Sequence, residues 1–215
     1  MANVNRPRGF STKSLLGGGL HSGQRLYAIP TSDTSNSYAI GDCVMSAASA
    51  DANGVPYIQK WGGVATTSAL PLGIISGIQV ADGGSASLVA ATLDLTQTYI
   101  LAGTRSTVRY VYVDDNPMAL FEAQFDSTAI AVTDLHKNAA VTVSASVAHT
   151  TATPYSTMVL TSPATTATLP IRLIGAIQET NNEIGAYVRV LCKWNYHEYG
   201  VTAGASGTVV SYLAP

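Results

Sequence analysis

The sequence predicts an all-β protein, built as a compact antiparallel sandwich or small barrel with an extended N-terminal arm. Three observations favour this class: short runs of alternating side chains, turn-forming residues between them, and no amphipathic helix longer than two or three turns. The clearest run is VRYVYVDDNPMALFEAQF (108–125), where alternation continues on both sides of the turn-forming residues Asp114 to Pro117. We therefore predict a β-hairpin here.

Strand-like runs cover most of the chain after residue 24. In order they are RLYAI (25–29), YAIGDCVMSA (38–47), VPYIQKW (55–61), PLGIISGIQV (71–80), TYILAG (98–103), AIAVTDLHKNAAVTVSASV (129–147), YSTMVL (155–160), IRLIGAIQ (171–178), AYVRVLCKWNYHEY (186–199) and VVSYL (209–213). SLVAATLDL (87–95) fits either a strand or one or two helical turns. Gly73 and Gly77 suggest bulges or sharp curvature within their run. The turn ETNNEIG (179–185) predicts a second hairpin, and no internal repeat of fixed period is found.

Residues 1–24 form the predicted arm, and residues 25–215 form the predicted β-rich domain, with one or two sub-sheets. The arm has three basic residues and no acidic one: Arg6, Arg8 and Lys13. Its composition offers no core, and Gly17 to Gly19 add a flexible joint. Two interpretations stay open: a disordered tail, or an arm that orders only against a neighbouring subunit and extends its sheet.

The charge pattern predicts a surface that other subunits cover. Charged residues make up 11% of the chain, against roughly 25% in typical soluble domains, and the formal net charge is -2. No Asp, Glu, Lys or Arg lies between Lys137 and Arg172, so nothing there would repel edge-to-edge strand pairing. The net charge argues against a nucleic-acid partner, and no apolar run has the length of a membrane helix or secretory signal.

We find no catalytic or metal-binding motif in the sequence. The four histidines are scattered, and CxxC, GxSxG and Walker A patterns do not occur. Asp114 with Asp115, and the loop SADANG (49–54), fit turn residues better than calcium ligands. Cys43 and Cys192 lie in apolar runs and are expected to be buried free thiols. We therefore predict no enzymatic activity, no metal and no cofactor.

Several phrases of the sequence resemble a group of tailed-bacteriophage virion proteins, the head decoration or capsid cement proteins. The phrases are MANVNRPRGF (1–10), YAIPTSDTSNSYAIGDCV (27–44) followed by SADANGVP (49–56), PLGIISGI (71–78), RYVYVDDNPMALFEAQF (109–125) and AYVRVLCKWNYH (186–197). The resemblance spans most of the chain. It departs from the group's pattern between Asn138 and Leu169 and in the ending WNYHEY (194–199).

The resemblance implies an all-β protein that is made in the bacterial cytoplasm. It would bind the outside of an icosahedral shell as a homotrimer. Its partners would be the major capsid protein, whose neighbouring subunits it bridges, and other copies of itself. We expect the arm to make the capsid contact through Arg6, Arg8, Phe10 and Lys13, with Phe10 as the apolar anchor. Deleting residues 1–16 is then expected to abolish capsid binding and leave the β domain folded.

Two other functions remain open from the sequence. One is a tail, baseplate or fibre-associated adaptor of the virion, because β-rich trimers occur there too. The other is a carbohydrate-binding module that uses exposed aromatic side chains as stacking platforms. Its candidate platforms are Trp61, Tyr155, Trp194 and Tyr196.

Overall fold

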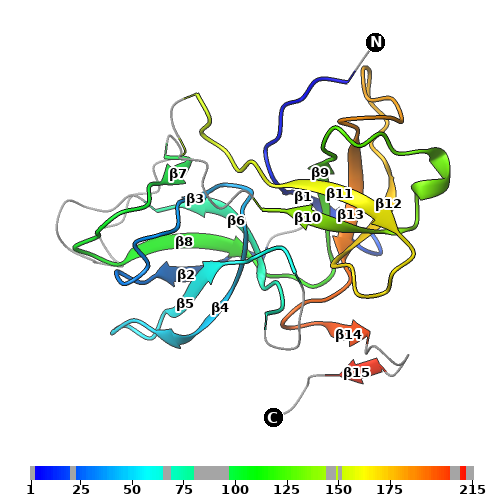
Figure 1. Cartoon of the computed structure of the whole chain (residues 1–215). Coiled ribbons are helices and arrows are strands. Elements are labelled where there is room, and N and C mark those ends of the chain that lie inside the picture. Colours follow the sequence, from blue (N-terminus) through cyan, green and yellow to red (C-terminus); the bar gives the residue numbers. More distant parts are fainter. Residues whose placement is uncertain are drawn as a thin grey trace.

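A computed structural model describes residues 3–19, 23–64, 69–79, 97–143, 149, 152–203 and 209–211. They form fifteen strands and one 3₁₀ helix (Val132–Asp134), with no α-helix among them (Figure 1). The strands are β1 (Ser11–Leu15), β2 (Arg25–Ile29), β3 (Tyr38–Ala39), β4 (Cys43–Ala50), β5 (Pro56–Lys60), β6 (Gly73–Ile78), β7 (Tyr99–Ile100), β8 (Arg109–Asp114), β9 (Ala119–Gln124), β10 (Asn138–Thr142), β11 (Val159–Ala164), β12 (Ile171–Ala176), β13 (Arg189–Trp194), β14 (Val201–Ala203) and β15 (Val209–Ser211). The prediction of an all-β protein is confirmed.

The first unit is a closed barrel of five strands in the order β2-β5-β4-β6-β8. Its one parallel pair is β2 with β5, joined at Ala28 and Tyr57, and all its other neighbours are antiparallel. Alternate side chains point inward and fill the barrel, as the period-two pattern requires. This first core consists of Tyr27, Ile29, Tyr38, Val44, Ile58, Leu72, Ile75, Ile78, Ile100, Val111 and Val113.

The second unit is a six-stranded sheet in the order β1-β9-β13-β12-β10-β11. Its last strand returns to the end of β9, where Phe125 and Leu160 form a parallel bridge. The Asp126 N–H also donates a hydrogen bond to the Leu160 carbonyl at 2.9 Å. Strands β9 to β13 are therefore curled into a ring that β11 closes at one end, with β1 added along the other end of β9.

The two units have the same strand circuit, by which we mean the order and the relative directions of neighbouring strands. When β9, β10, β11, β12 and β13 are matched in order with β2, β4, β5, β6 and β8, every neighbouring pair has a counterpart of the same direction. The register shifts just before Gly77 in β6 and just before Gly175 in β12, each time against the last strand of the unit. The two units are thus topologically equivalent, a relation that the search for a fixed period missed because the connecting loops differ in length.

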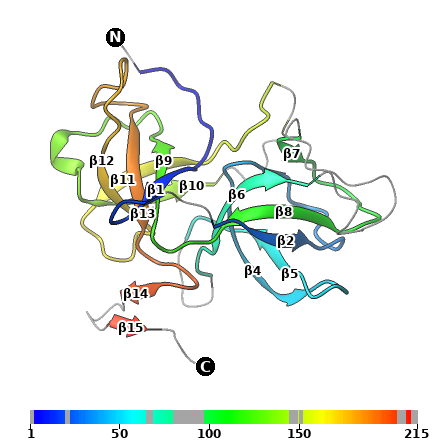
Figure 2. The same cartoon turned by 180° about the vertical axis from the view of Figure 1, so that it is seen from behind.

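The barrel and the sheet lie side by side and share a second core (Figure 2). Cys43, Trp61 and Ile74 come from the barrel, and they pack against sheet residues that include Phe121 and Trp194. The Trp61 and Trp194 rings meet edge to face with centroids 6.1 Å apart. Because both cysteines are buried in this core and free, the expectation for Cys43 and Cys192 is confirmed.

The run 108–125 is not a hairpin. Its two strands exist, but β8 pairs with β2 and β6 in the barrel, whereas β9 pairs with β1 and β13 in the sheet. The turn residues Asp115 to Met118 instead carry the chain from one unit into the other. The second predicted hairpin is confirmed, because β12 and β13 pair directly, with Leu173 opposite Cys192.

The N-terminal residues run extended along the sheet unit, and part of them belongs to it. Ser11–Leu15 is the edge strand β1, and Phe10 is buried in the shared core. Neither open interpretation, a disordered tail or an arm that orders only against a neighbouring subunit, describes these residues, because they pair and pack within their own chain. Of the other predicted elements, 87–95, part of 129–147 and the end of 209–213 lie outside the described residues.

Candidate interaction surface

The N-terminal residues line a polar surface of the sheet unit. A cavity of about 530 Å³ lies between residues 3–13 and the ends of β9 and β13. Its lining includes Arg6, Arg8, Lys13, Glu122, Gln124, Asn181, Asn182 and Arg189. Three of the four predicted contact residues therefore come together on one surface, which has basic, acidic and amide groups.

Arg6 and Arg8 have the exposure expected of contact residues. The Arg6 backbone N–H donates to Gln124 Oε1 at 3.0 Å, which fixes the chain and leaves the guanidinium in solvent. The Arg8 guanidinium lies over the Tyr155 ring, 5.4 Å from its centroid, in a cation–π contact. Both side chains are positioned to meet a partner with acidic groups.

Lys13 is part of an ion-pair network. Its Nζ lies 2.6 Å from Glu122 Oε2, and the second Glu122 oxygen pairs with Arg189 Nη1 at 3.0 Å. Arg189 also bonds Glu179 at 2.6 Å, which raises the pKa of the guanidinium and lowers the pKa of the Glu179 carboxyl. Lys13 is half exposed, but its charge is already balanced within the chain.

Phe10 does not offer an exposed anchor. Its side chain is 2% exposed and lies with centroids 5.9 Å from the Trp194 ring, stacked, and 6.4 Å from Phe121, edge to face. The prediction of Phe10 as the apolar contact to a capsid is therefore wrong in this conformation, because the ring is used inside the protein. A lone aromatic residue beside Gly9 was the sequence signal for this role.

Glycines explain how the N-terminal residues approach the barrel so closely. A Cβ on Gly9 would lie 2.3 Å from the Gly41 carbonyl oxygen, and one on Gly41 would lie 2.2 Å from the Arg8 carbonyl oxygen. Both residues also have positive φ angles, 67° and 93°, that favour glycine. The Phe10 N–H then donates to the Gly41 carbonyl at 3.0 Å, which joins the N-terminal residues to the barrel.

The two aspartates of the inter-unit connection are buried structural groups. Asp114 accepts a hydrogen bond from the Thr12 hydroxyl on β1, and Asp115 accepts from Tyr27 Oη at 2.7 Å and pairs with Arg25 at 3.0 Å. Burial is the main cause of the raised pKa of Tyr27. These contacts bind β1, β2 and the connection together, which agrees with turn residues rather than calcium ligands.

Cys43, Cys192 and His197 are buried side chains whose pKa values are shifted by burial. Burial raises the pKa of the Cys43 and Cys192 thiols, so both stay protonated at neutral pH. Burial lowers the pKa of His197 to about 4, and its Nδ1 accepts the Tyr199 N–H at 3.0 Å. Within the described ranges, no three His, Cys, Asp or Glu side chains are grouped as metal ligands.

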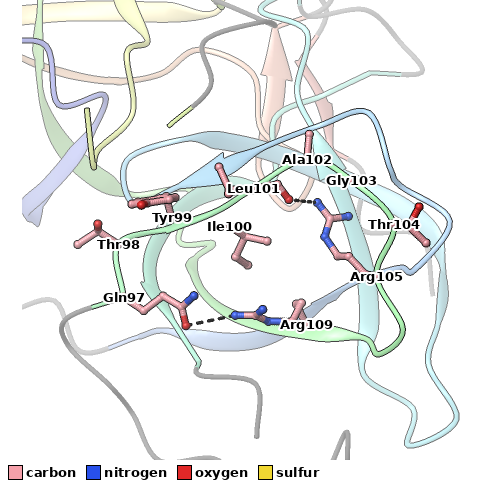
Figure 3. Close-up of a pocket in the computed structure, with 10 residues that line it drawn as sticks. All are labelled: Gln97, Thr98, Tyr99, Ile100, Leu101, Ala102, Gly103, Thr104, Arg105 and Arg109. Atoms are coloured by element: carbon pink, nitrogen blue, oxygen red, sulfur yellow. Dashed lines mark hydrogen bonds between the residues drawn. The ribbon is translucent and has the colours of Figure 1, made fainter. Parts of the chain in front are cut away.

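A second cavity, of about 620 Å³, lies at the loop after β7 (Figure 3). Arg105 is held there by the Leu101 and Asn36 carbonyls at 3.0 and 2.9 Å, and Arg109 Nη2 donates to Gln97 Oε1 at 3.2 Å. Burial and the neighbouring Arg105 charge lower the pKa of Arg109. No motif in the sequence indicates this basic cavity, because a loop without a recognisable pattern separates Gln97 from the two arginines.

The aromatic residues considered as sugar platforms are largely occupied. Trp61 and Trp194 are buried in the shared core, so neither offers a face to a ligand. Tyr155 is half-buried beneath Arg8, and the half-buried Tyr196 donates its hydroxyl hydrogen bond to the Ala167 carbonyl. This arrangement gives no row of exposed rings among the four candidates.

The fold and this surface define an all-β protein of two topologically equivalent units, with the N-terminal strand β1 added to the edge of the second unit. No family model, curated protein or solved structure was found to match the chain. In the described residues, no helix has the length and apolar character needed to cross a membrane.

Proposed function

We propose that this chain is a structural virion protein that decorates the outside of a tailed-phage capsid. It would stabilise the shell by bridging neighbouring major capsid protein subunits, as a homotrimer and without enzymatic activity. The observation that carries the proposal is the set of phrases similar to head decoration proteins, which spans most of the chain.

The positions of these phrases support the proposal, because they meet in space. Gly9 and Phe10 of the first phrase pack on Gly41 of the second and on Trp194 of the last. Gly73 of the third phrase lies so close to the fourth that a Cβ there would be 2.1 Å from the Asp114 carbonyl oxygen. The first, second and last phrases therefore meet where the two units contact each other, and the third and fourth are neighbours at β6 and β8 of the barrel.

The capsid contact would be made by the surface around the N-terminal residues. Arg6 and Arg8 are exposed there, and β1 is an edge strand whose described partner is β9 alone. An edge strand can accept a further strand, and exposed arginines suit acidic groups on the partner. Many such weak contacts, repeated over a shell, would stabilise the expanded lattice by mass action and multivalency.

Binding to purified heads that lack the protein tests this function. We expect the wild-type chain to co-sediment with heads, and the double variant Arg6→Ala/Arg8→Ala to bind roughly 5- to 30-fold more weakly, for about 1–2 kcal/mol from two lost charge contacts. Lys137→Ala is the matched control, because Lys137 pairs locally with Asp134 at 2.8 Å, away from this surface. Substitutions are preferable to deleting residues 1–16, which would also remove Phe10 from the core.

Labelled protein viewed on whole particles separates the proposal from its nearest alternative. Label on the head facets supports a decoration protein, whereas label confined to the tail supports a tail or baseplate adaptor. Wild-type protein that binds no part of the particle would overturn both functions.

A further inference from the structure

The N-terminal segment, residues 3–15, is held by contacts with residues that follow β2 in the sequence. Asn3 Nδ2 donates to the Glu183 carbonyl at 2.7 Å, the Phe10 N–H bonds Gly41, and Lys13 pairs with Glu122. The acceptor site for this segment is complete without the segment itself. It would therefore accept the same residues from another copy of the chain, through the same hydrogen bonds and ion pairs.

Few buried residues hold the N-terminal segment. Only Gly9 and Phe10 are buried in the N-terminal segment, and the other residues are exposed or half-buried. The β1–β9 pairing covers four residue pairs, and its register shifts between Thr12 and Ser14. One buried aromatic ring, a short, irregular ladder and the polar contacts of Asn3, Thr12 and Lys13 thus hold the segment in place.

A hinge follows the strand directly. Gly17, Gly18 and Gly19 have φ angles of 99°, 81° and 141°, which only glycine adopts freely. Among the described residues, no atom beyond the two chain neighbours lies within 4 Å of a Cβ placed on any of the three. Reorienting these residues would release the segment, and Phe10 would then leave the shared core of its own copy until a segment from another copy replaces it.

We propose that the N-terminal segment exchanges between copies, so that in concentrated protein each segment occupies the acceptor site of a second copy in a closed oligomer. The segment binds to the same residues in both forms, and protein concentration therefore decides between them. Exchange would also let the segment order against a neighbouring subunit without leaving Phe10 in solvent. The inference concerns the protein alone and does not depend on the proposed capsid role.

A disulfide between two different copies tests the exchange directly. Ser11 and Glu122 are opposite each other in the β1–β9 register, at a distance that a cysteine pair can bridge. One variant carries Ser11→Cys, and the other carries Glu122→Cys. The two native cysteines are fully buried and stay in both. The variants are mixed at high concentration, oxidised mildly and separated without reductant.

We expect a covalent heterodimer whose yield rises with protein concentration. The matched control replaces Ser11→Cys by Ser35→Cys, an exposed serine in the barrel, and should give no heterodimer above background. The double variant Ser11→Cys/Glu122→Cys should give an internal disulfide in dilute protein, which shows that the pair can form. An internal disulfide in the double variant with no heterodimer in the mixture would overturn the proposal, as would a double variant that forms no disulfide.

The hinge gives an independent measurement. The triple variant Gly17→Ala/Gly18→Ala/Gly19→Ala strains the turn of the unexchanged form, because L residues disfavour positive φ. We expect it to raise the exchanged fraction at least about tenfold in size-exclusion chromatography. An unchanged or lower oligomer fraction in a folded triple variant would contradict the hinge role.

Discussion

The two units have the same strand circuit but close it differently. In the barrel, β2 meets β5 directly and the core is made of residues from the barrel and the β3–β7 pair. In the sheet unit, β11 reaches β9 only at Phe125, and β1 takes the rest of that edge. The core of the sheet unit also contains Phe10, which precedes β1, and Trp61, which follows β5 of the barrel.

This difference shows that one topology can give a self-contained unit and a dependent one. The barrel keeps most of its buried apolar residues inside a closed ring, and Cys43, Trp61 and Ile74 pack against the sheet unit. The sheet unit buries one of its faces against the barrel and the N-terminal segment, and it therefore needs both to be in place. Four substitutions test whether the sheet unit depends on the barrel and on the N-terminal segment.

Trp194→Ala should have the largest effect. The ring is 3% exposed and contacts Phe10, Trp61 and Phe121, so it joins the sheet, the barrel and the N-terminal segment. Removing a buried Trp leaves a large cavity, and we expect the free energy of unfolding to fall by about 3–5 kcal/mol in urea denaturation. Leu101→Ala, at an exposed position, is the control, and an equally small change in both variants would contradict the shared core.

Phe10→Ala should lower the free energy of unfolding by about 2–4 kcal/mol, and it should do so unevenly. Hydrogen exchange is expected to speed up in β9 and β13 much more than in β2 and β8, because the ring packs only against the shared core. Val4→Ala, at a side chain 64% exposed, should change neither quantity. Equal loss of protection in both units would show that the barrel is not self-contained.

Gly73→Ala tests a contact that the sheet unit does not have. Its Cβ would lie 2.1 Å from the Asp114 carbonyl oxygen, so β6 and the end of β8 must shift apart, for about 1–3 kcal/mol of unfolding free energy. Gly175→Ala in the equivalent strand β12 is the matched control, because nothing lies within 4 Å of its Cβ. Thermal melting that ranks these two variants equally would contradict the close contact of β6 with β8.

His197 should make the protein less stable in acid. Burial lowers its pKa to about 4 from 6.5, so the folded form keeps it neutral while the unfolded chain takes up a proton. The stability contribution is complete above pH 6.5 and is lost as the pH falls toward 4, by up to about 1.4 kcal/mol for each pH unit. His197→Gln should flatten the dependence of unfolding free energy on pH in this window. A variant with the wild-type slope would show that other groups cause it.

The strands themselves could be predicted, but not all of their partners. The runs 108–125 and 171–199 have the same strand–turn–strand pattern, yet one joins two units and the other is a hairpin. The turn at Asp115 to Met118 permits either outcome. Contacts of the buried Asp114 and Asp115 with Thr12, Arg25 and Tyr27 hold the two strands in different units, and no local pattern specifies them.

The candidate surface was also predicted only in part, because contacts between residues far apart in the chain decide the rest. Arg6 and Arg8 are exposed as basic residues in a Gly- and Pro-containing segment should be. Phe10 was assigned outward because its neighbours in sequence offer no core. Its actual site is made by Phe121 and Trp194, which lie far along the chain, so only their meeting in space could reveal it.

The sequence by itself determined the all-β class, the position of most strands and the burial of both cysteines. It could do so because side-chain alternation records which face of a strand is buried. The tertiary structure alone decided which strands are neighbours, that two rings share one circuit, and that Phe10 completes the second core. Strand pairing uses backbone hydrogen bonds that are the same for every sequence, and its choice therefore depends on packing between residues far apart in the chain.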